Sequence, residues 1–193
     1  MNYIEETNRR RITILMILIS FAFIFTAFVV ENPLYVLKGE WEIITSPGIL
    51  ITDYIAFANL GSAFFNAGLT TLIGCGLAWV IKARFNGYLL SAIFTLAGFS
   101  FFGKNPFNIM PIFIGVYLYD KFFSHQPLRD LIAPLLFGTT LAPVVSQIAF
   151  GFGWGVKGIL LGTGIGIICG GLMAAIMGHI YTFHQGYNLY NTG

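Results

Sequence analysis

The chain alternates long apolar stretches with short polar turns, a pattern typical of helices that cross a membrane. A helix needs roughly 17–25 apolar residues to cross the hydrocarbon core of a bilayer. Residues 12–30 form the cleanest such stretch, and residues 131–150 and 158–180 form two more. The apolar segments 48–81 and 88–119 are each too long for one untilted helix at about 1.5 Å per residue. We therefore predict an all-α integral membrane protein with four to six transmembrane helices.

Polar residues interrupt the two longest segments, which predicts broken or re-entrant helices. In 48–81 we expect a half-helix, a break near Gly61 and a full span through 69–81. In 88–119 the sequence GKNPFN at 103–108 leaves arms of about 15 and 13 residues, each short for a span. Basic loops lie on both sides of this segment, so we expect the chain to return to its starting side, as a tight two-span hairpin or as a re-entrant loop.

The basic residues predict the orientation. Three arginines at 9–11 precede the first span, and an excess of positive charge marks the cytoplasmic side. This favours a multi-pass protein of the bacterial cytoplasmic (inner) membrane with a cytoplasmic N-terminus, and it places the polar interval 31–48 outside. A secretory signal peptide would begin in the same way, but 19 unbroken apolar or hydroxyl residues exceed the usual signal core. A retained anchor is therefore favoured.

A short glycine and asparagine pattern recurs along the chain. GKNPFN at 103–108 and GYNLYN at 186–191 both read G-x-N-x-aromatic-N, and 61–68 aligns with 186–193 as G-x-x-x-aromatic-N-x-G. An odd number of crossings between 61 and 186 would make these copies an inverted repeat, an arrangement that places broken helices around a site near the bilayer midplane.

The same pattern divides the chain into three segments. Residues 1–47 hold the cytoplasmic tail, the first transmembrane helix and the outer loop; 48–185 form the helical membrane core; and 186–193 are where a second repeat would begin. Since the sequence stops inside that last copy, we expect a homo-oligomer or pairing with a second half.

The recurring motif supplies the candidate binding site. Asn105 before Pro106 is typical of a helix N-cap followed by proline at the first helical position, which aims free backbone N–H groups at the break. An ammonium such as Lys104 is costly at apolar depth unless it is paired, so its presence favours an anion or a dipolar solute. The predicted substrate-binding residues are Asn66, Lys104, Asn105, Asn108, Asn188 and Asn191.

Each of these residues also has a plain structural interpretation. Lys104 would lie in water or among headgroups if 103–106 were an ordinary surface turn. The asparagine amides would hydrogen-bond neighbouring helices together. Asp53 is the one acid inside an apolar stretch, so it is either a residue that couples transport to protons or Na⁺ or the cap of a half-helix.

Composition narrows the function further. The chain is 56% hydrophobic and 9% charged with a net charge of +2, which excludes a water-soluble enzyme and a nucleic-acid binding surface and makes the lipid bilayer the expected partner. Its residues form no paired catalytic set, so we predict no enzyme, cofactor or metal site. The favoured function is a transporter or channel for a small polar or anionic solute; the alternative is a non-transporting membrane scaffold or assembly subunit.

Three motifs also carry a resemblance to a known family. On the sequences FNAGL at 65–69, GKNPFN at 103–108 and HQGYNLYNTG at 184–193, the chain resembles the N-terminal half of an uncharacterised bacterial family of polytopic membrane proteins, described only as a domain of unknown function. The resemblance implies a membrane fold and assigns no substrate.

Overall fold

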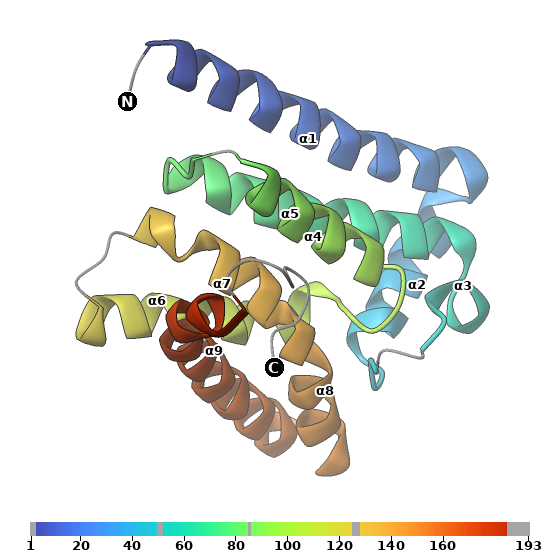
Figure 1. The fold of residues 1–193 in the computed structure, drawn as a ribbon. Helices are drawn as coiled ribbons and strands as arrows, with labels where there is room; N and C mark the ends of the chain where they lie inside the picture. Colours follow the sequence, from blue (N-terminus) through green and yellow to red (C-terminus); the bar gives the residue numbers. More distant parts are fainter. Residues whose placement is uncertain (1–2, 50–51, 85, 125–127, 185–193) are drawn as a thin grey trace.

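The computed structural model is all α-helical and describes residues 3–49, 52–84, 86–124 and 128–184. Figure 1 shows the helices packed together, with shorter helices in the connections between some of the long ones. In chain order they are α1 (Tyr3–Val30), α2 (Pro33–Ile44), α3 (Tyr54–Phe57), α4 (Leu60–Val80), α5 (Gly87–Phe99), α6 (Pro106–Phe123), the 3₁₀ turn η1 (Leu128–Asp130), α7 (Ile132–Gly138), the 3₁₀ turn η2 (Thr139–Leu141), α8 (Ala142–Gly151) and α9 (Val156–His184).

Three helices are long and apolar enough to cross a membrane, namely Glu6–Val30 in α1, Leu60–Val80 in α4 and Val156–Ile176 in α9. They correspond to three of the predicted spans. Gly87–Phe99 and Leu135–Gly151 are shorter apolar helical segments. Together these helices indicate a multi-pass membrane protein, since large apolar side chains such as Phe25 and Leu160 are exposed on the outside of the bundle.

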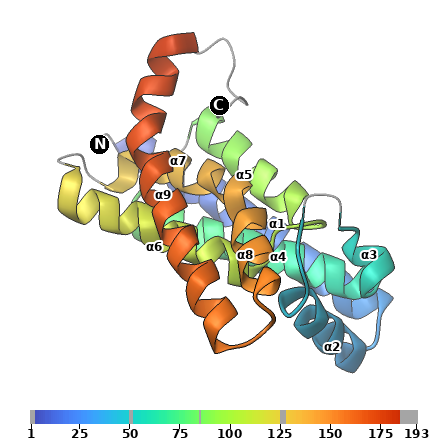
Figure 2. The same cartoon turned by 90° about the horizontal axis from the view of Figure 1, so that it is seen from below.

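The break in the segment 88–119 lies where the sequence predicts it. α5 ends at Phe99, Gly103 adopts a left-handed backbone with φ of 82°, and Asn105 caps α6, which begins at Pro106. In both Figure 1 and Figure 2 the far end of α6 lies on the side of the molecule that holds the N-terminal end of α1. α6 therefore ends at the end of the bundle where α1 begins, and the predicted return of the chain to one side of a membrane stays a prediction.

The predicted break near Gly61 is wrong by a few residues. α3 ends at Phe57, and the Asn59 side chain accepts a hydrogen bond from the Ser62 backbone N–H at 2.7 Å, so α4 begins at Leu60 and runs through Gly61 without interruption. Gly61 instead allows close packing, because a Cβ there would lie 2.9 Å from the Ala27 carbonyl oxygen of α1.

Two further elements differ from the sequence prediction. The interval 31–48, predicted as an outer loop, contains α2, which buries Val36, Gly39, Glu40 and Ile43. The predicted span 131–150 is split by η2 into α7 and α8. Pro143 lies in the first turn of α8, where a residue without an N–H group is tolerated, so a new helix starts there.

Candidate functional site

A buried polar cluster lies where the α5–α6 break meets the α7–α8 break. It combines residues from α4, from the connection between α5 and α6, from the first turn of α6, from η2 and from α8. All of its members have fully buried side chains; they are Asn66, Lys104, Asn105, Asn108, Thr139 and Ser146. Polar groups at such a depth are costly unless they are paired, and in membrane proteins irregular backbone is tolerated where it packs against protein or lines a cavity.

Lys104 connects the two breaks. The left-handed turn at Gly103 brings Lys104 to the interior, where its Nζ donates to Thr139 Oγ1 at 2.9 Å and lies 5.1 Å from the centre of the Phe99 ring. The Thr139 hydroxyl in turn donates to the Leu136 carbonyl at 2.6 Å. No ion pair of Lys104 occurs in the described part of the chain. The ammonium therefore has one hydrogen-bond acceptor for its three N–H groups.

Asn66 holds the two ends of the α5–α6 break together. Its amide Nδ2 donates to the Ser100 carbonyl and, at 2.8 Å, to the Lys104 carbonyl. Its carbonyl Oδ1 is buried without a hydrogen-bond partner among the described residues, and so is the hydroxyl of Thr70, one turn further along α4. Buried polar atoms without partners are rare, so these two oxygens are candidates to contact a bound solute.

Asn105 and Asn108 form the reciprocal capping box of α6. Each side-chain oxygen accepts the backbone N–H of the other residue, at 3.0 and 2.9 Å. The Asn108 amide also donates to the Gly103 carbonyl at 2.8 Å and to Ser146 Oγ at 3.1 Å, which ties the break to α8. These two asparagines therefore position the break and already use most of their hydrogen-bonding groups.

The structure brings together four of the seven predicted site residues. Asn66, Lys104, Asn105 and Asn108 share the cluster described above. Asp53 lies outside it: its exposed carboxylate accepts the Ile55 and Ala56 backbone N–H groups and caps α3, the structural alternative considered from the sequence. The remaining two, Asn188 and Asn191, lie outside the described residues.

Several residues of the site carry no signal in the sequence that places them there. Thr139 and Ser146 are ordinary hydroxyl residues inside a predicted span, and only the second break brings them to Lys104 and Asn108. Tyr54 is another such residue; its hydroxyl lies 3.5 Å from the Asn105 amide, which also donates to the Ile43 carbonyl of α2 at 3.2 Å. α2 and α3 thereby extend the cluster.

Glu40 of α2 is a further buried group near the cluster. Glu40 is 6% exposed, and neither of its carboxyl oxygens has a hydrogen-bond partner among the described residues. Burial raises the pKa of the Glu40 carboxyl to about 8, and α2 is not one of the three membrane-spanning candidates. The folded protein therefore holds a proton on Glu40 at a pH where the unfolded chain has released it.

We expect this proton to make stability depend on pH. Because the folded pKa lies above the unfolded one, stability falls as pH rises from about 4.5 towards about 8, by at most about 1.4 kcal/mol per pH unit. The Glu40→Gln variant should unfold at a higher temperature than the wild type at pH 8 and at a similar temperature at pH 4.5. The measurement is the thermal unfolding temperature of both proteins in detergent at several pH values between 4.5 and 8. If the difference between the two unfolding temperatures does not change with pH, the expected effect of the Glu40 proton is contradicted.

These features define a multi-pass membrane protein whose interrupted helices meet around a buried lysine. The chain belongs to the family described as "Protein of unknown function (DUF1576)", whose model matches residues 32–193 and so includes the whole candidate site. The predicted resemblance to a domain of unknown function is thereby confirmed, while the expectation that the chain is one half of a longer protein stays a prediction. No curated protein and no solved structure matches the chain.

Proposed function

We propose that the protein is a membrane transporter or channel for a small polar or anionic solute, which binds where the α5–α6 and α7–α8 breaks meet. The observation that carries this proposal is the Lys104 ammonium, which is fully buried and, among the described residues, donates to a single acceptor, the Thr139 hydroxyl. A buried cation without a carboxylate is stabilised when an anion or a strong dipole supplies the missing acceptors. In a membrane protein such ionisable residues usually mark the path of a solute.

The surrounding groups fit a solute that both accepts and donates hydrogen bonds. Lys104 offers unused N–H groups, whereas Asn66 Oδ1 and Thr70 Oγ1 of α4 are buried acceptors without partners among the described residues. Replacing the hydration shell of a solute requires such fixed donors and acceptors in a narrow, partly apolar passage. We extend the proposal to an inverted repeat in the cytoplasmic membrane with the N-terminus inside, since that arrangement sets broken helices around the midplane.

Flux through reconstituted protein tests the proposal. Liposomes holding the wild type should pass at least one of chloride, nitrate, formate, acetate and urea faster than protein-free liposomes. The Lys104→Met variant should lose this flux by about tenfold or more, because a charge-assisted hydrogen bond contributes roughly 1.5–3 kcal/mol. It should unfold at the same or a higher temperature, since a side chain of similar size replaces an unpaired buried charge.

The Lys38→Met variant is the matched control, because Lys38 is an exposed lysine on α2. It should keep the wild-type flux. The proposal fails if the folded wild type passes none of the five solutes, or if Lys104→Met and Lys38→Met have the same flux.

A scaffold is the second candidate function, favoured by a different observation. The amides of Asn66, Asn105 and Asn108 all donate to backbone carbonyls, which is how amides stabilise helix contacts in membranes. In that case Lys104→Met should change the assembly or the yield of the protein, as measured by size-exclusion chromatography, and should have no flux to lose.

A further inference from the structure

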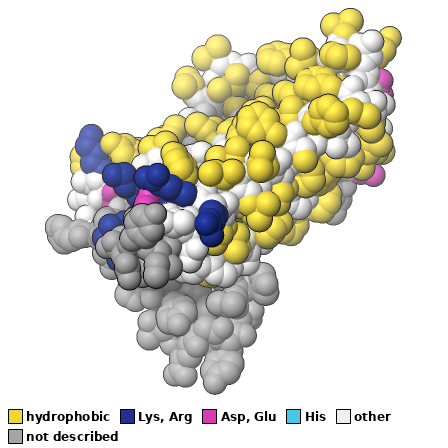
Figure 3. All heavy atoms as spheres, turned by 90° about the horizontal axis from the view of Figure 1, so that it is seen from above, with side chains coloured by type: hydrophobic (Ala, Val, Ile, Leu, Met, Phe, Trp, Pro, Cys, Tyr) yellow, Lys and Arg dark blue, Asp and Glu magenta, His cyan; other side chains and the backbone are white. Residues whose placement is uncertain are grey.

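A second charged site lies at the shared end of α1 and α4, away from the Lys104 cluster. A cavity of about 620 Å³ opens there, lined by Glu6, Arg9, Arg10, Trp79, Val80 and Lys82. Figure 3 shows the basic side chains gathered at this end of the molecule, while hydrophobic side chains cover most of the rest of the visible face. The lining holds three cations and one acid, so an anion is the ligand that its charge favours.

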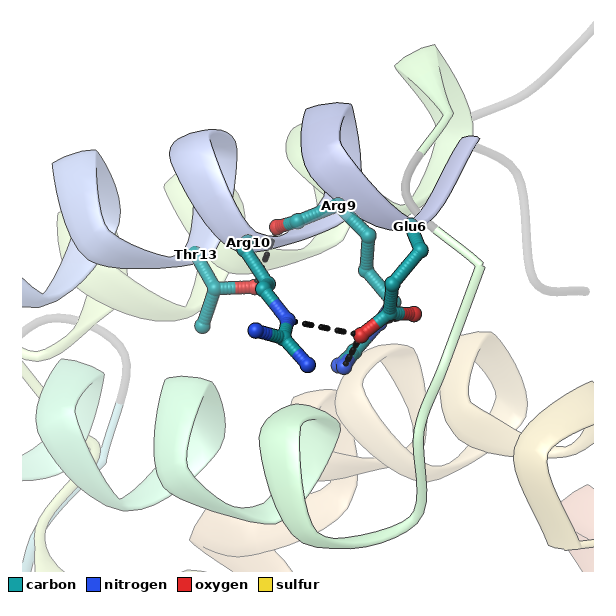
Figure 4. Close-up of polar contacts among 4 residues, drawn as sticks. All are labelled: Glu6, Arg9, Arg10 and Thr13. Carbon is teal, nitrogen blue, oxygen red and sulfur yellow. Dashed lines mark hydrogen bonds and ion pairs between the residues drawn. The ribbon is translucent and has the colours of Figure 1, made fainter. Parts of the chain in front are cut away.

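Glu6, the one acid among the described residues that line the cavity, does not pair every N–H group of Arg9. Figure 4 shows Glu6 between Arg9 and Arg10; its carboxylate accepts from Arg9 Nη2 at 2.7 Å, from Arg9 Nε at 2.9 Å and from Arg10 Nε at 2.9 Å. Arg9 is 6% exposed, and its guanidinium carbon lies 4.9 Å from the centre of the Trp79 ring. Its Nη1 has no hydrogen-bond partner in the part of the chain that the structure describes. A buried guanidinium N–H group without an acceptor is costly, and a ligand oxygen in the cavity would supply one.

Lys82 reaches the same cavity from an unfavourable backbone conformation. It has φ of 54°, the left-handed region that favours glycine, and α4 ends there with hydrogen bonds from the Lys82 N–H to the Trp79 carbonyl and from the Ala83 N–H to the Ala78 carbonyl. Glycine is the usual residue at this position of such a helix end. A lysine held in this conformation beside two arginines is an outlier of the kind found at functional sites.

The location of the cavity identifies the anion. α1 and α4 are both candidate spans, and the cavity lies where their apolar stretches end. That level of a bilayer holds the lipid phosphates, and basic cavities between membrane helices bind anionic headgroups. Trp79 and Val80 are 39% and 74% exposed, so they give the cavity an apolar side suited to the glycerol and upper acyl carbons of a lipid.

We propose that this cavity binds the phosphate group of an anionic phospholipid, with Arg9 Nη1, Arg10 and Lys82 as its hydrogen-bond donors. Free phosphate has the same donors available, but it would not use the apolar side formed by Trp79 and Val80. The lipid is therefore the occupant to which the structure points.

The test uses the full chain in detergent, with phosphatidylglycerol, phosphatidylcholine or inorganic phosphate added. Native mass spectrometry should show phosphatidylglycerol retained over phosphatidylcholine, and phosphatidylglycerol alone should raise the thermal unfolding temperature. Lys82→Gly should weaken phosphatidylglycerol binding by about fivefold, the effect of one basic residue near an anionic lipid. Without lipid it should unfold at the same or a higher temperature than the wild type, because glycine suits the left-handed backbone.

Two other variants complete the comparison. Arg10→Gln removes a partly exposed donor of the cavity and should weaken phosphatidylglycerol binding similarly, whereas Lys38→Ala removes an exposed lysine of α2 and should leave it unchanged. The proposal is overturned if the wild type retains phosphatidylglycerol and phosphatidylcholine equally. It is also overturned if Lys82→Gly prefers phosphatidylglycerol over phosphatidylcholine as strongly as the wild type does. Stabilisation by millimolar inorganic phosphate equal to that by phosphatidylglycerol overturns the lipid assignment.

Discussion

Replacing Gly170 by leucine is expected to prevent the chain from forming its native helix bundle. A Cβ at position 170 of α9 would overlap the Ile112 backbone carbonyl of α6, and a Cβ at Gly115 of α6 would overlap the Ile167 carbonyl of α9. The two backbones are therefore in direct contact. A larger side chain has no flexible neighbour to displace, so it must push α6 away from α9.

The expected cost of Gly170→Leu is roughly 3 kcal/mol or more, since overpacking a well-packed contact already costs about 1–3 kcal/mol. Size-exclusion chromatography in detergent should show an aggregated or strongly depleted protein. Gly164→Leu is the matched control on the same helix, because a Cβ there meets no atom within 4 Å. A Gly170→Leu protein that elutes and unfolds like Gly164→Leu would contradict the close contact.

The glycines of the bundle show that a residue type alone does not predict its structural role. Gly162, Gly166 and Gly170 recur every four residues along α9, a spacing typical of closely packed membrane helices, and a Cβ at each of them would meet α6 or α8. The same residue type at Gly61 favoured a break instead. A glycine is compatible with a helix break and with close helix packing. At Gly61 the structure shows close packing, because α1 lies beside α4.

The centre of the candidate site could be predicted because its signals are local. Within four positions the chain has a left-handed turn at Gly103, a helix cap at Asn105 and a first helical residue at Pro106. This local combination ends one helix and starts the next. The buried partners depend on contacts between distant segments. Thr139 reaches Lys104 across 35 positions, and nothing near residue 139 in the sequence indicates this contact.

At Glu40 the sequence pattern led to a wrong prediction of the local structure. Three glutamates within 31–42 make this interval the most polar of the chain, so it was predicted as an outer loop. α2 nevertheless packs Glu40 inward while Leu34 and Trp41 are exposed. Average polarity predicts where a segment lies relative to the membrane, but it does not predict which face of a short helix packs against its neighbour.

Replacing Asn66 by leucine is expected to destabilise the fold because it removes the two hydrogen bonds that the Asn66 amide donates across the α5–α6 break. The Ser100 and Lys104 carbonyls would remain buried without the Asn66 amide, at roughly 1–3 kcal/mol for each lost partner. We expect a clear fall in the thermal unfolding temperature measured in detergent. An unchanged temperature would mean that the break is held by the capping box of α6 alone.

Thr70→Val is the informative counterpart of Asn66→Leu, because it changes a buried polar residue one turn away on the same helix. The Thr70 hydroxyl has no hydrogen-bond partner, so removing it should leave the unfolding temperature unchanged or raise it. If Thr70 contacts a permeating solute, the same variant should reduce flux while the protein stays folded. Asn66 would then stabilise the break, whereas Thr70 would contact the solute. Measuring both the flux and the unfolding temperature of each variant separates these two roles.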